Sequence, residues 1–290
     1  MIASLHAEHP EWSERLLCRL LDVARSSYYY AAKPADDLEL RDAIERIALE
    51  YPRYGYRRVT AELARRGHEA NHKRVLCIMR QESLLVQVER LCRTTNSEHE
   101  YGRYPNLVKD LVIDRVDQVW CADITYIRLR RELVYLAVIL DIYPRAIRGW
   151  QLGRNLTEEL SRQALERALA KGRRPEYHHS DQGVQYAANG YVARLQELGV
   201  KVSMAARGQP TENPFAERLM RTLKEEEVYL NEYADFAEAY SRIGRFLDDV
   251  YMKKRVHSSL GYKTPAEFEA EHVMEAGNGS FPTCARSSGG

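Results

Sequence analysis

The chain has 290 residues, of which 44% are hydrophobic and 29% charged, and its formal net charge is +1. This composition is typical of a protein with a folded core and excludes a chain that is disordered as a whole. No apolar segment approaches 18 residues and the first segment is polar, which excludes a membrane span and a secretory signal and predicts a cytoplasmic protein. The length allows two domains, or one domain with a smaller appendage.

The cysteines argue against a disulfide framework, because there are five of them and no two have CxxC spacing. His68 and His72 are four residues apart, with Cys77 and Cys92 downstream, so a zinc module is one interpretation of this segment. The other interpretation is a polar helix face followed by two buried thiols. The absence of a paired cysteine spacing favours the second interpretation.

Residues 1–35 are expected to form an N-terminal helical segment, with a short helix over residues 11–32. Helical patterns then occur at residues 36–50, from about Arg57 to Gly67, and from an Asn71 N-cap to about Glu82. Three short helices, the last rich in Lys and Arg, are typical of a helix-turn-helix unit, which places one helix in the major groove of DNA. We therefore predict a DNA-binding domain at residues 36–93.

The charge of this segment supports a polyanionic partner. Between Tyr51 and Arg93 there are ten Lys or Arg residues and four acids, in a chain that is otherwise nearly neutral. On charge alone, a solvated helical surface is an equally good explanation. The residues expected to contact DNA here are Arg57, Arg58, Lys73 and Arg74.

A polar stretch at residues 94–114 predicts a linker, and the pattern changes after it. Strand-like segments are expected at residues 119–129, 133–143, 146–152, 176–180 and 200–205, and helices at residues 157–170, at 187–198 and from about 213 and 233. Three consecutive strands followed by alternating helices and strands predict an α/β sheet flanked by helices, in the order of the ribonuclease H-like fold. This core is expected at residues 115–232, followed by a helical C-terminal extension at 233–272 and a disordered tail at 273–290.

Three acids of the predicted core suggest a site. Asp123 lies inside an otherwise apolar strand, where a carboxylate is costly unless it is paired or bound to a cation. Asp181 follows a short strand, and Glu217 lies in the first turn of a helix, after a loop with Gly and Pro. Two magnesium ions that bridge a phosphate need carboxylate oxygens from several directions. Spacing alone is weak evidence, because 42 acids provide many similar pairs.

Five ordered segments resemble a known family. WCADITYI, LDIYPRAIRGW, HSDQGVQY, ENPFAERLMRTLKEE and HSSLGYKTPAEF are similar to segments of second-frame transposases of bacterial insertion-sequence family three, which are relatives of retroviral integrases with a DDE triad. The segment YGYRRVTAELARRG also resembles the helix-turn-helix of that family, so that the resemblance covers roughly residues 25–270.

The resemblance implies a DDE polynucleotidyl transferase with Asp123, Asp181 and Glu217 as catalytic residues and as ligands of two Mg²⁺ or Mn²⁺ ions. The implied reaction is the nicking of DNA at the element end, followed by strand transfer from the freed 3′-hydroxyl, without a covalent enzyme intermediate. Ala122 and Pro144 depart from the family's usual Thr and Ser, and Arg218 stands where Ser often follows the Glu. Arg218 either pairs with Glu217 and competes with metal, or contacts DNA.

Neighbours of the triad are predicted to assist it. Arg221 and Lys224 share a helix face with Glu217 and are predicted to contact DNA, although an ordinary ion pair is the alternative. His179 and Gln182 flank Asp181 and are expected to orient its carboxylate or to touch DNA. For His179 the alternative is a side chain satisfied at a strand end.

Two further features complete the predicted site. Asp141 is expected to cap the turn before Pro144 rather than to join the triad. Lys253, Lys254 and Arg255 lie in a segment without acids and are predicted to contact the DNA backbone, unless the segment is simply a solvated turn.

The resemblance also implies partners. They are double-stranded DNA, as element ends and as target, and further copies of the chain in a homo-oligomer on DNA at the nucleoid. In the family, an upstream first reading frame supplies an end-binding helix-turn-helix and a zipper by frameshifting, so this chain acts either alone or as part of a fusion. Two other functions stay open: a DNA-binding protein with a decayed catalytic domain, which would not cleave, and a ribonuclease H-type nuclease, which would cleave without joining.

Overall fold

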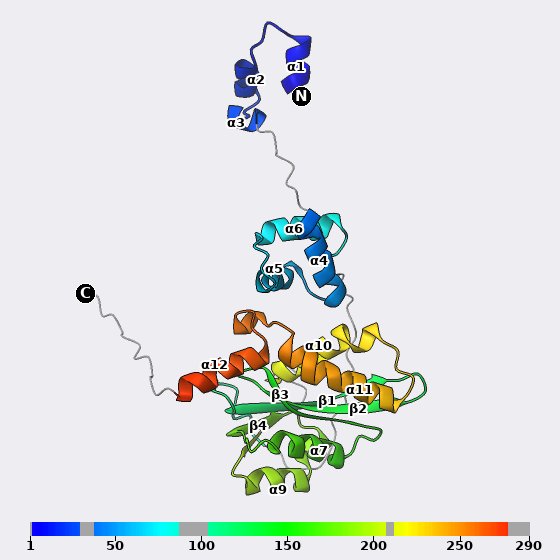
Figure 1. The fold of residues 1–290 in the computed structure, drawn as a ribbon. Coiled ribbons are helices and arrows are strands. Elements are labelled where there is room, and N and C mark those ends of the chain that lie inside the picture. The colour runs from blue at the N-terminus through cyan, green and yellow to red at the C-terminus, as the bar shows by residue number, and fades with distance from the viewer. Residues whose placement is uncertain (1, 30–37, 87–103, 207–211, 278–290) are drawn as a thin grey trace, which may run out of the picture. The chain divides into compact units, whose positions relative to one another are not determined.

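The computed structural model describes residues 2–29, 38–86, 104–206 and 212–277 (Figure 1). The chain forms two compact units, Met1–Ala43 and Ile44–Gly290, each of which is considered by itself. In the described ranges, none of the helices is long and apolar enough to span a membrane.

The N-terminal unit contains three short helices, α1 (Ile2–Glu8), α2 (Glu14–Leu20) and α3 (Arg25–Tyr28). The sequence predicted one helix here instead of α2 and α3. The break occurs at Asp22, whose left-handed backbone conformation (φ 51°) lets the amide of Val23 bond to the carbonyl of Cys18 and so ends α2. Tyr28 then donates a hydrogen bond back to Glu14, which folds α3 against α2.

The second unit includes most of the predicted DNA-binding segment, which forms α4 (Leu38–Glu50), α5 (Tyr56–Arg65) and α6 (His72–Gln81). The predicted helix boundaries are confirmed: Asn71 caps α6 by accepting from the amide of Lys73, and Gly67 follows α5 with a φ of 84°. The expectation of buried thiols is wrong for Cys77, which is exposed, and Cys92 lies outside the described residues.

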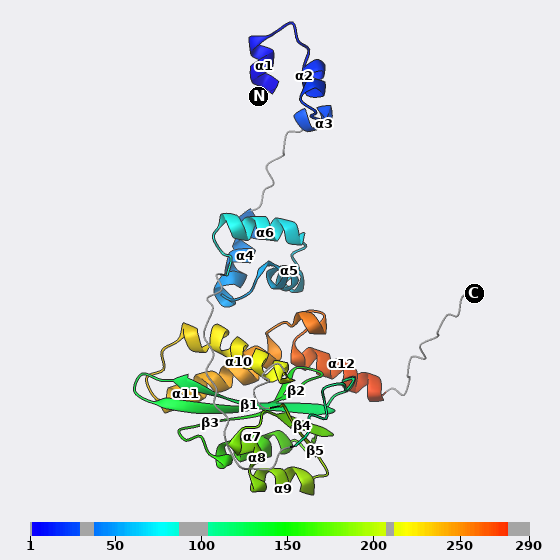
Figure 2. The same cartoon turned by 180° about the vertical axis from the view of Figure 1, so that it is seen from behind.

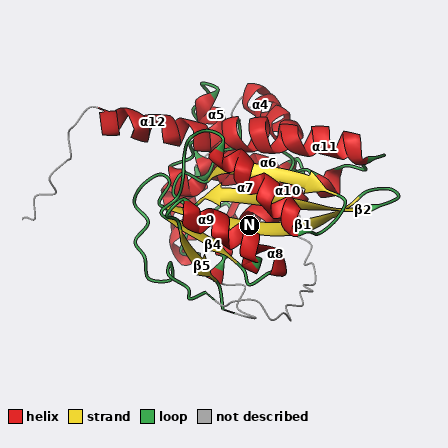
Figure 3. Cartoon of the chain, turned by 90° about the horizontal axis from the view of Figure 1, so that it is seen from below, coloured by secondary structure: helices red, strands yellow, loops and turns green. Residues whose placement is uncertain are grey.

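The predicted α/β core is a five-stranded sheet, which Figure 3 shows in yellow. Its strands are β1 (Val119–Arg128), β2 (Leu133–Asp141), β3 (Ala146–Gly153), β4 (Tyr177–Ser180) and β5 (Lys201–Met204). The spatial order is β3-β2-β1-β4-β5, in which β1 to β3 are antiparallel neighbours while β4 is parallel to both β1 and β5. All five predicted strands are therefore confirmed, with small shifts at their ends.

Helices cover both faces of this sheet (Figures 1 and 2). One face packs on α7 (Glu158–Leu169), α8 (Val184–Ala187) and α9 (Asn189–Glu197), and the other on α10 (Pro214–Glu226) and α11 (Phe236–Arg245). The contact of α7 with β3 is close at Gly149, where a Cβ atom would lie 2.3 Å from the carbonyl oxygen of Ala164. Only glycine fits there without a shift of the backbone.

The C-terminal part continues the α10 face of the sheet. A 3₁₀ turn (Val228–Leu230) precedes α11, a π-helical turn (Phe246–Tyr251) extends it, and a second 3₁₀ turn (Ser258–Leu260) leads to α12 (Pro265–Gly277). Side chains of α11 and of the π-helical turn, among them Ile243 and Leu247, belong to the same apolar core as β1, β2 and α10. The segment after residue 232 is thus part of the core, and residues 278–290 lie outside the described residues.

Candidate active site

The pairing of β1 with β4 brings two of the predicted acids to one place. The two strands run parallel from Val119 opposite Tyr177 to Cys121 opposite His179. Asp123 lies two residues beyond Cys121 in β1, and Asp181 lies two residues beyond His179, just after the end of β4. The two aspartates therefore occupy equivalent positions on the same face of the sheet. Asp123 is held on its other side by β2, where it lies opposite Val138. Beyond Cys121 the edge of β1 no longer pairs with β4, and Asp123 and Asp181 are both partly buried there.

The start of α10 brings the third acid to β1. Asn213 precedes the helix and Pro214 occupies its first position, which suits the fixed φ of proline. The buried side-chain amide of Asn213 donates a hydrogen bond to the backbone carbonyl of Ala122 (3.1 Å). The backbone amide of Glu217 donates to the backbone carbonyl of Asn213 (3.2 Å). This chain of bonds ties the first turn of α10 to the strand residue before Asp123.

The pKa of Asp123 depends on the two other acids. Burial in its surroundings raises the pKa of Asp123 to about 8, and the charges of Asp181 and Glu217 raise it as well. The amide of Ile124, which donates to Asp123 (2.8 Å), and the ammonium of Lys224 act in the opposite direction. Asp123 is thus acted on by two other carboxylates and by one cation.

The carboxylates are held in part by the backbone. The amide of Gly183 donates to Asp181 Oδ1 at 3.0 Å, and a Cβ atom at Gly183 would lie 2.9 Å from the same oxygen. Even so, no group of three or more His, Cys, Asp or Glu side chains in the described ranges is placed to hold a metal ion. Asp181 and Glu217 thus act on the pKa of Asp123, but the three side chains are not arranged as a metal-binding group among the described residues.

His179 and Gln182, which were predicted to assist Asp181, have different surroundings. His179 is buried, with its ring nitrogens 2.9 Å from Ser203 Oγ and 3.0 Å from the carbonyl oxygen of Glu212, and burial lowers its pKa. His179 therefore fits the second interpretation, a histidine whose two ring nitrogens are both hydrogen-bonded within the protein. Its contact with Glu212 holds the segment before α10. Gln182 is partly buried next to Asp181.

The two predicted DNA contacts of α10 also differ from each other. Arg221 is exposed, whereas Lys224 is partly buried, with its Nζ 4.6 Å from the centroid of the Tyr126 ring. Burial lowers the pKa of Lys224, and the charge of Asp123 opposes this shift.

Among the remaining predicted DNA contacts, Arg57, Lys73, Lys253 and Lys254 are exposed, and Arg58 and Arg74 are partly buried. Arg255 is only 3% exposed and binds Glu226 through Nε (2.7 Å) and Nη2 (2.8 Å). Its guanidinium group is occupied inside the protein, so this structure favours a supporting role for Arg255 over direct contact with DNA.

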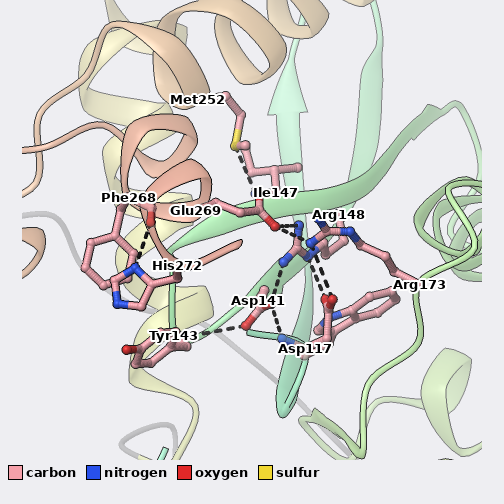
Figure 4. A network of polar contacts seen from close by, with 11 residues as sticks. Asp117, Asp141, Tyr143, Ile147, Arg148, Arg173, Met252, Phe268, Glu269 and His272 are labelled. Atoms are coloured by element: carbon pink, nitrogen blue, oxygen red, sulfur yellow. Dashed lines mark hydrogen bonds and ion pairs between the residues drawn. The ribbon is translucent and has the colours of Figure 1, made fainter. Parts of the chain in front are cut away.

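Asp141 is the centre of a separate network, shown in Figure 4. The fully buried carboxylate accepts hydrogen bonds from the amides of Asp117 (2.7 Å) and Tyr143 (3.2 Å) and from Arg148 (2.6 Å). Arg148 also binds Glu269 of α12 at 2.7 Å. Asp141 therefore caps the turn before Pro144, as predicted, and stays outside the triad.

Two residues that the sequence did not single out help to build the site. Asn213 connects α10 to β1, as described above. Tyr186 is buried, its hydroxyl has no hydrogen-bond partner among the described residues, and its pKa is raised by burial and by the charges of Asp123 and Asp181. Both residues lie in the segments that carry the family resemblance, but nothing in their residue type or spacing distinguishes them from ordinary core residues.

Comparisons with known proteins agree with this architecture. A family model described as an HTH-like domain matches residues 35–92, and two models described as integrase core domains match residues 114–210 and 198–265. An uncharacterized 31 kDa protein of insertion element IS600 from Shigella sonnei is 34% identical over 90% of this chain and 100% of its own length. The transposase for insertion sequence element IS904 from Lactococcus lactis is 32% identical over 75% of this chain and 87% of its own length.

Solved structures include two viral integrases. The HTLV-2 integrase catalytic core domain in complex with magnesium covers 53% of this chain and 96% of that chain, with 16% identity and a TM-score of 0.44. An intasome structure of simian T-cell lymphotropic virus covers 86% of this chain and 78% of that chain, with 18% identity and a TM-score of 0.47. The sheet order and the integrase core models together confirm the predicted ribonuclease H-like fold.

Proposed function

The chain belongs to the transposases of bacterial insertion-sequence family three, and on that premise we propose that Asp123, Asp181 and Glu217 form its catalytic triad. Family membership makes it a polynucleotidyl transferase of insertion-sequence transposition. The observation that supports the triad is the pairing of β1 with β4, which brings Asp123 and Asp181 to one edge of the sheet, together with the effect of Asp181 and Glu217 on the pKa of Asp123. Groups with strongly shifted pKa values concentrate at functional sites.

Use of a divalent metal goes with the integrase core, and we propose two Mg²⁺ or Mn²⁺ ions held by the triad. The chemistry of the donors fits, because carboxylate oxygens are the ligands that a hard divalent cation prefers. In this proposal, Asp123, Asp181 and Glu217 would supply the carboxylate oxygens that hold the ions. Bound metal would stabilise negative charge on the phosphate and activate the attacking oxygen.

The protein's own residues prepare this site. The amides of Ile124 and Gly183 orient two of the carboxylates, and Asn213 fixes the helix that carries the third. Lys224, close to Asp123, and Arg221, one turn after Glu217, are proposed to bind DNA phosphates next to the reacting bond.

The N-terminal elements are proposed to bind double-stranded DNA at residues 36–93, with the exposed Arg57 and Lys73 and the partly buried Arg74 on its surface. The assembly is proposed to be a homo-oligomer that holds element ends and target DNA at the nucleoid. An upstream first-frame product, as a partner or as a fusion, is proposed to add end recognition.

One experiment tests the triad directly. The chain, alone and fused to its first-frame product, is incubated with labelled element ends and Mg²⁺, with Glu217→Gln as the comparison. The wild type should cleave the ends and join them to target, whereas Glu217→Gln should bind the ends without cutting. Full nicking by Asp181→Asn would refute the assignment.

The same experiment separates the alternatives. Cleavage without joined products would indicate a nuclease, and DNA binding without any metal-dependent cleavage would indicate a decayed catalytic domain. Calorimetric titration of Mn²⁺ adds a readout that does not depend on activity, because Asp123→Asn should lose the binding that the wild type shows.

A further inference from the structure

The charges of four arginine side chains act on one buried histidine, His257. The arginines are Arg58 of α5, Arg145 in the turn between β2 and β3, Arg218 of α10, and Arg255. Burial and the charges of all four guanidinium groups lower the pKa of His257 to about 2. Arg255 is the nearest of them, with its Nη1 3.3 Å from His257 Nε2. Arg58 and Arg255 also lie against the same carboxylate, Glu226. Arg145 stacks on Phe215, which lies one helical turn before Arg218 on α10, so these cations come together from distant parts of the sequence.

Glu226 is the acid that this arginine cluster contacts directly. Glu226 is bound by Arg255 at 2.7 and 2.8 Å and lies 3.5 Å from Arg58. Asp141 also acts on Arg145, but it is already bound by Arg148. Among the described residues, the four guanidinium groups thus carry about three more positive charges than Glu226 neutralises. Like charges packed so closely repel one another unless an anion joins them.

Arg145 is the member that most clearly requires an outside acceptor. Its Nη1 is buried and has no hydrogen-bond partner among the described residues, which is costly for a charged donor. Its backbone is in the left-handed region (φ 57°), an unfavourable conformation for a side chain of this size. The guanidinium group lies 4.0 Å from the centroid of the Phe215 ring, so that its plane is held in place.

Arg218 connects the arginine cluster to solvent and to the triad. Its side chain is exposed, and it follows Glu217 directly on α10. A ligand that reaches Arg218 from outside is therefore one residue away from a proposed catalytic acid.

We propose that Arg145 and Arg218, supported by Arg58 and Arg255, bind one phosphate group of the DNA backbone beside Glu217. This inference rests on the proposed function, because that function supplies DNA as the ligand. The planar guanidinium group binds phosphate through two parallel hydrogen bonds, and several arginines together select a phosphate over a neutral group. For Arg218, we therefore favour contact with DNA over an ion pair with Glu217, because the other arginines of the cluster provide further donors for the same phosphate.

The test measures the affinity of the full chain for a fluorescent DNA duplex over a series of salt concentrations. Removal of one phosphate interaction should reduce the slope of log K against log salt by about 0.9. Arg218→Gln and Arg145→Gln should each show this reduction, and the double variant should show no larger reduction than either single variant, because both arginines bind the same phosphate. Arg162→Gln is the matched control, since this exposed arginine lies on α7, on the other face of the sheet.

Each outcome decides the proposal. An unchanged slope in Arg218→Gln with DNA still bound overturns it and leaves the proposed function standing, whereas a wild type that binds no DNA refutes both. Thermal melts with inorganic phosphate form a second arm. If phosphate stabilises the wild type but not Arg218→Gln, and the DNA slopes are equal, the site takes free phosphate and the DNA assignment is wrong. Arg218 is exposed, so its substitution keeps the test valid even if Arg145→Gln fails to fold.

Discussion

Asp123 and Asp141 lie on neighbouring strands of the same sheet but have opposite surroundings. Asp141 is closed off from solvent and is satisfied within the chain by two amides and by Arg148, so that burial and these partners together leave its pKa at about 6. Asp123 remains partly accessible, has one amide partner, and faces two more carboxylates. A carboxylate that the fold neutralises serves stability, whereas one that the fold leaves uncompensated is available to an external cation.

The sharpest test of this contrast is Asp123→Asn. The variant should lose several kcal/mol of stabilisation of the reaction's transition state, which is about a thousandfold or more in cleavage rate. Its melting temperature near neutral pH should stay equal or rise, because the fold raises the pKa of Asp123 and so disfavours the ionised form that the unfolded chain prefers, whereas asparagine does not ionise. Single-turnover cleavage and thermal melts check both parts, and a marked loss of stability together with normal cleavage would reverse the roles of the two aspartates.

The counterpart on β2 is Arg148→Met, which leaves Asp141 buried without its cation. Removal of one partner of a buried pair should destabilise the fold by about 3–5 kcal/mol. Urea unfolding measures this effect. The double variant Asp141→Leu with Arg148→Met should recover part of the loss, and failure to recover any would show that the network acts through more than this pair.

A smaller effect is expected at the link between β1 and α10. Asn213→Ala removes the hydrogen bond to the carbonyl of Ala122 and should cost about 1–3 kcal/mol. Since Glu217 is then less well positioned, cleavage should fall while DNA affinity stays as in the wild type. A variant with reduced stability and unchanged cleavage would mean that the link serves the fold alone.

The smallest effect concerns the ion pair between Arg65 of α5 and Glu267 of α12, which lowers the pKa of Glu267 to about 2. Because this value lies below the pKa of the unfolded chain, the pair stabilises the fold fully above about pH 4.5 and loses its effect as the pH falls toward 2. The difference in melting temperature between wild type and Glu267→Gln should therefore shrink on acidification. A constant difference would assign the effect to packing rather than charge.

The sequence predicted the strands well because their apolar runs are long and are separated by clear changes of pattern. The three proposed catalytic acids could be named from motifs, and the parallel pairing of β1 with β4 explains why Asp123 and Asp181 lie at the same edge of the sheet. The bond from Asn213 to Ala122, the unpartnered hydroxyl of Tyr186 and the burial of Arg255 could not be predicted. Each of them depends on contacts between residues far apart in the chain, which leave no local periodicity in the sequence.

The packing of α11 and α12 also has a practical consequence for expression of the catalytic core by itself. A protein truncated at residue 232 would expose the apolar surface that Ile243 and Leu247 cover, and it would leave Arg148 without Glu269. Such a fragment is expected to aggregate during purification, whereas a boundary after residue 277 retains both contacts.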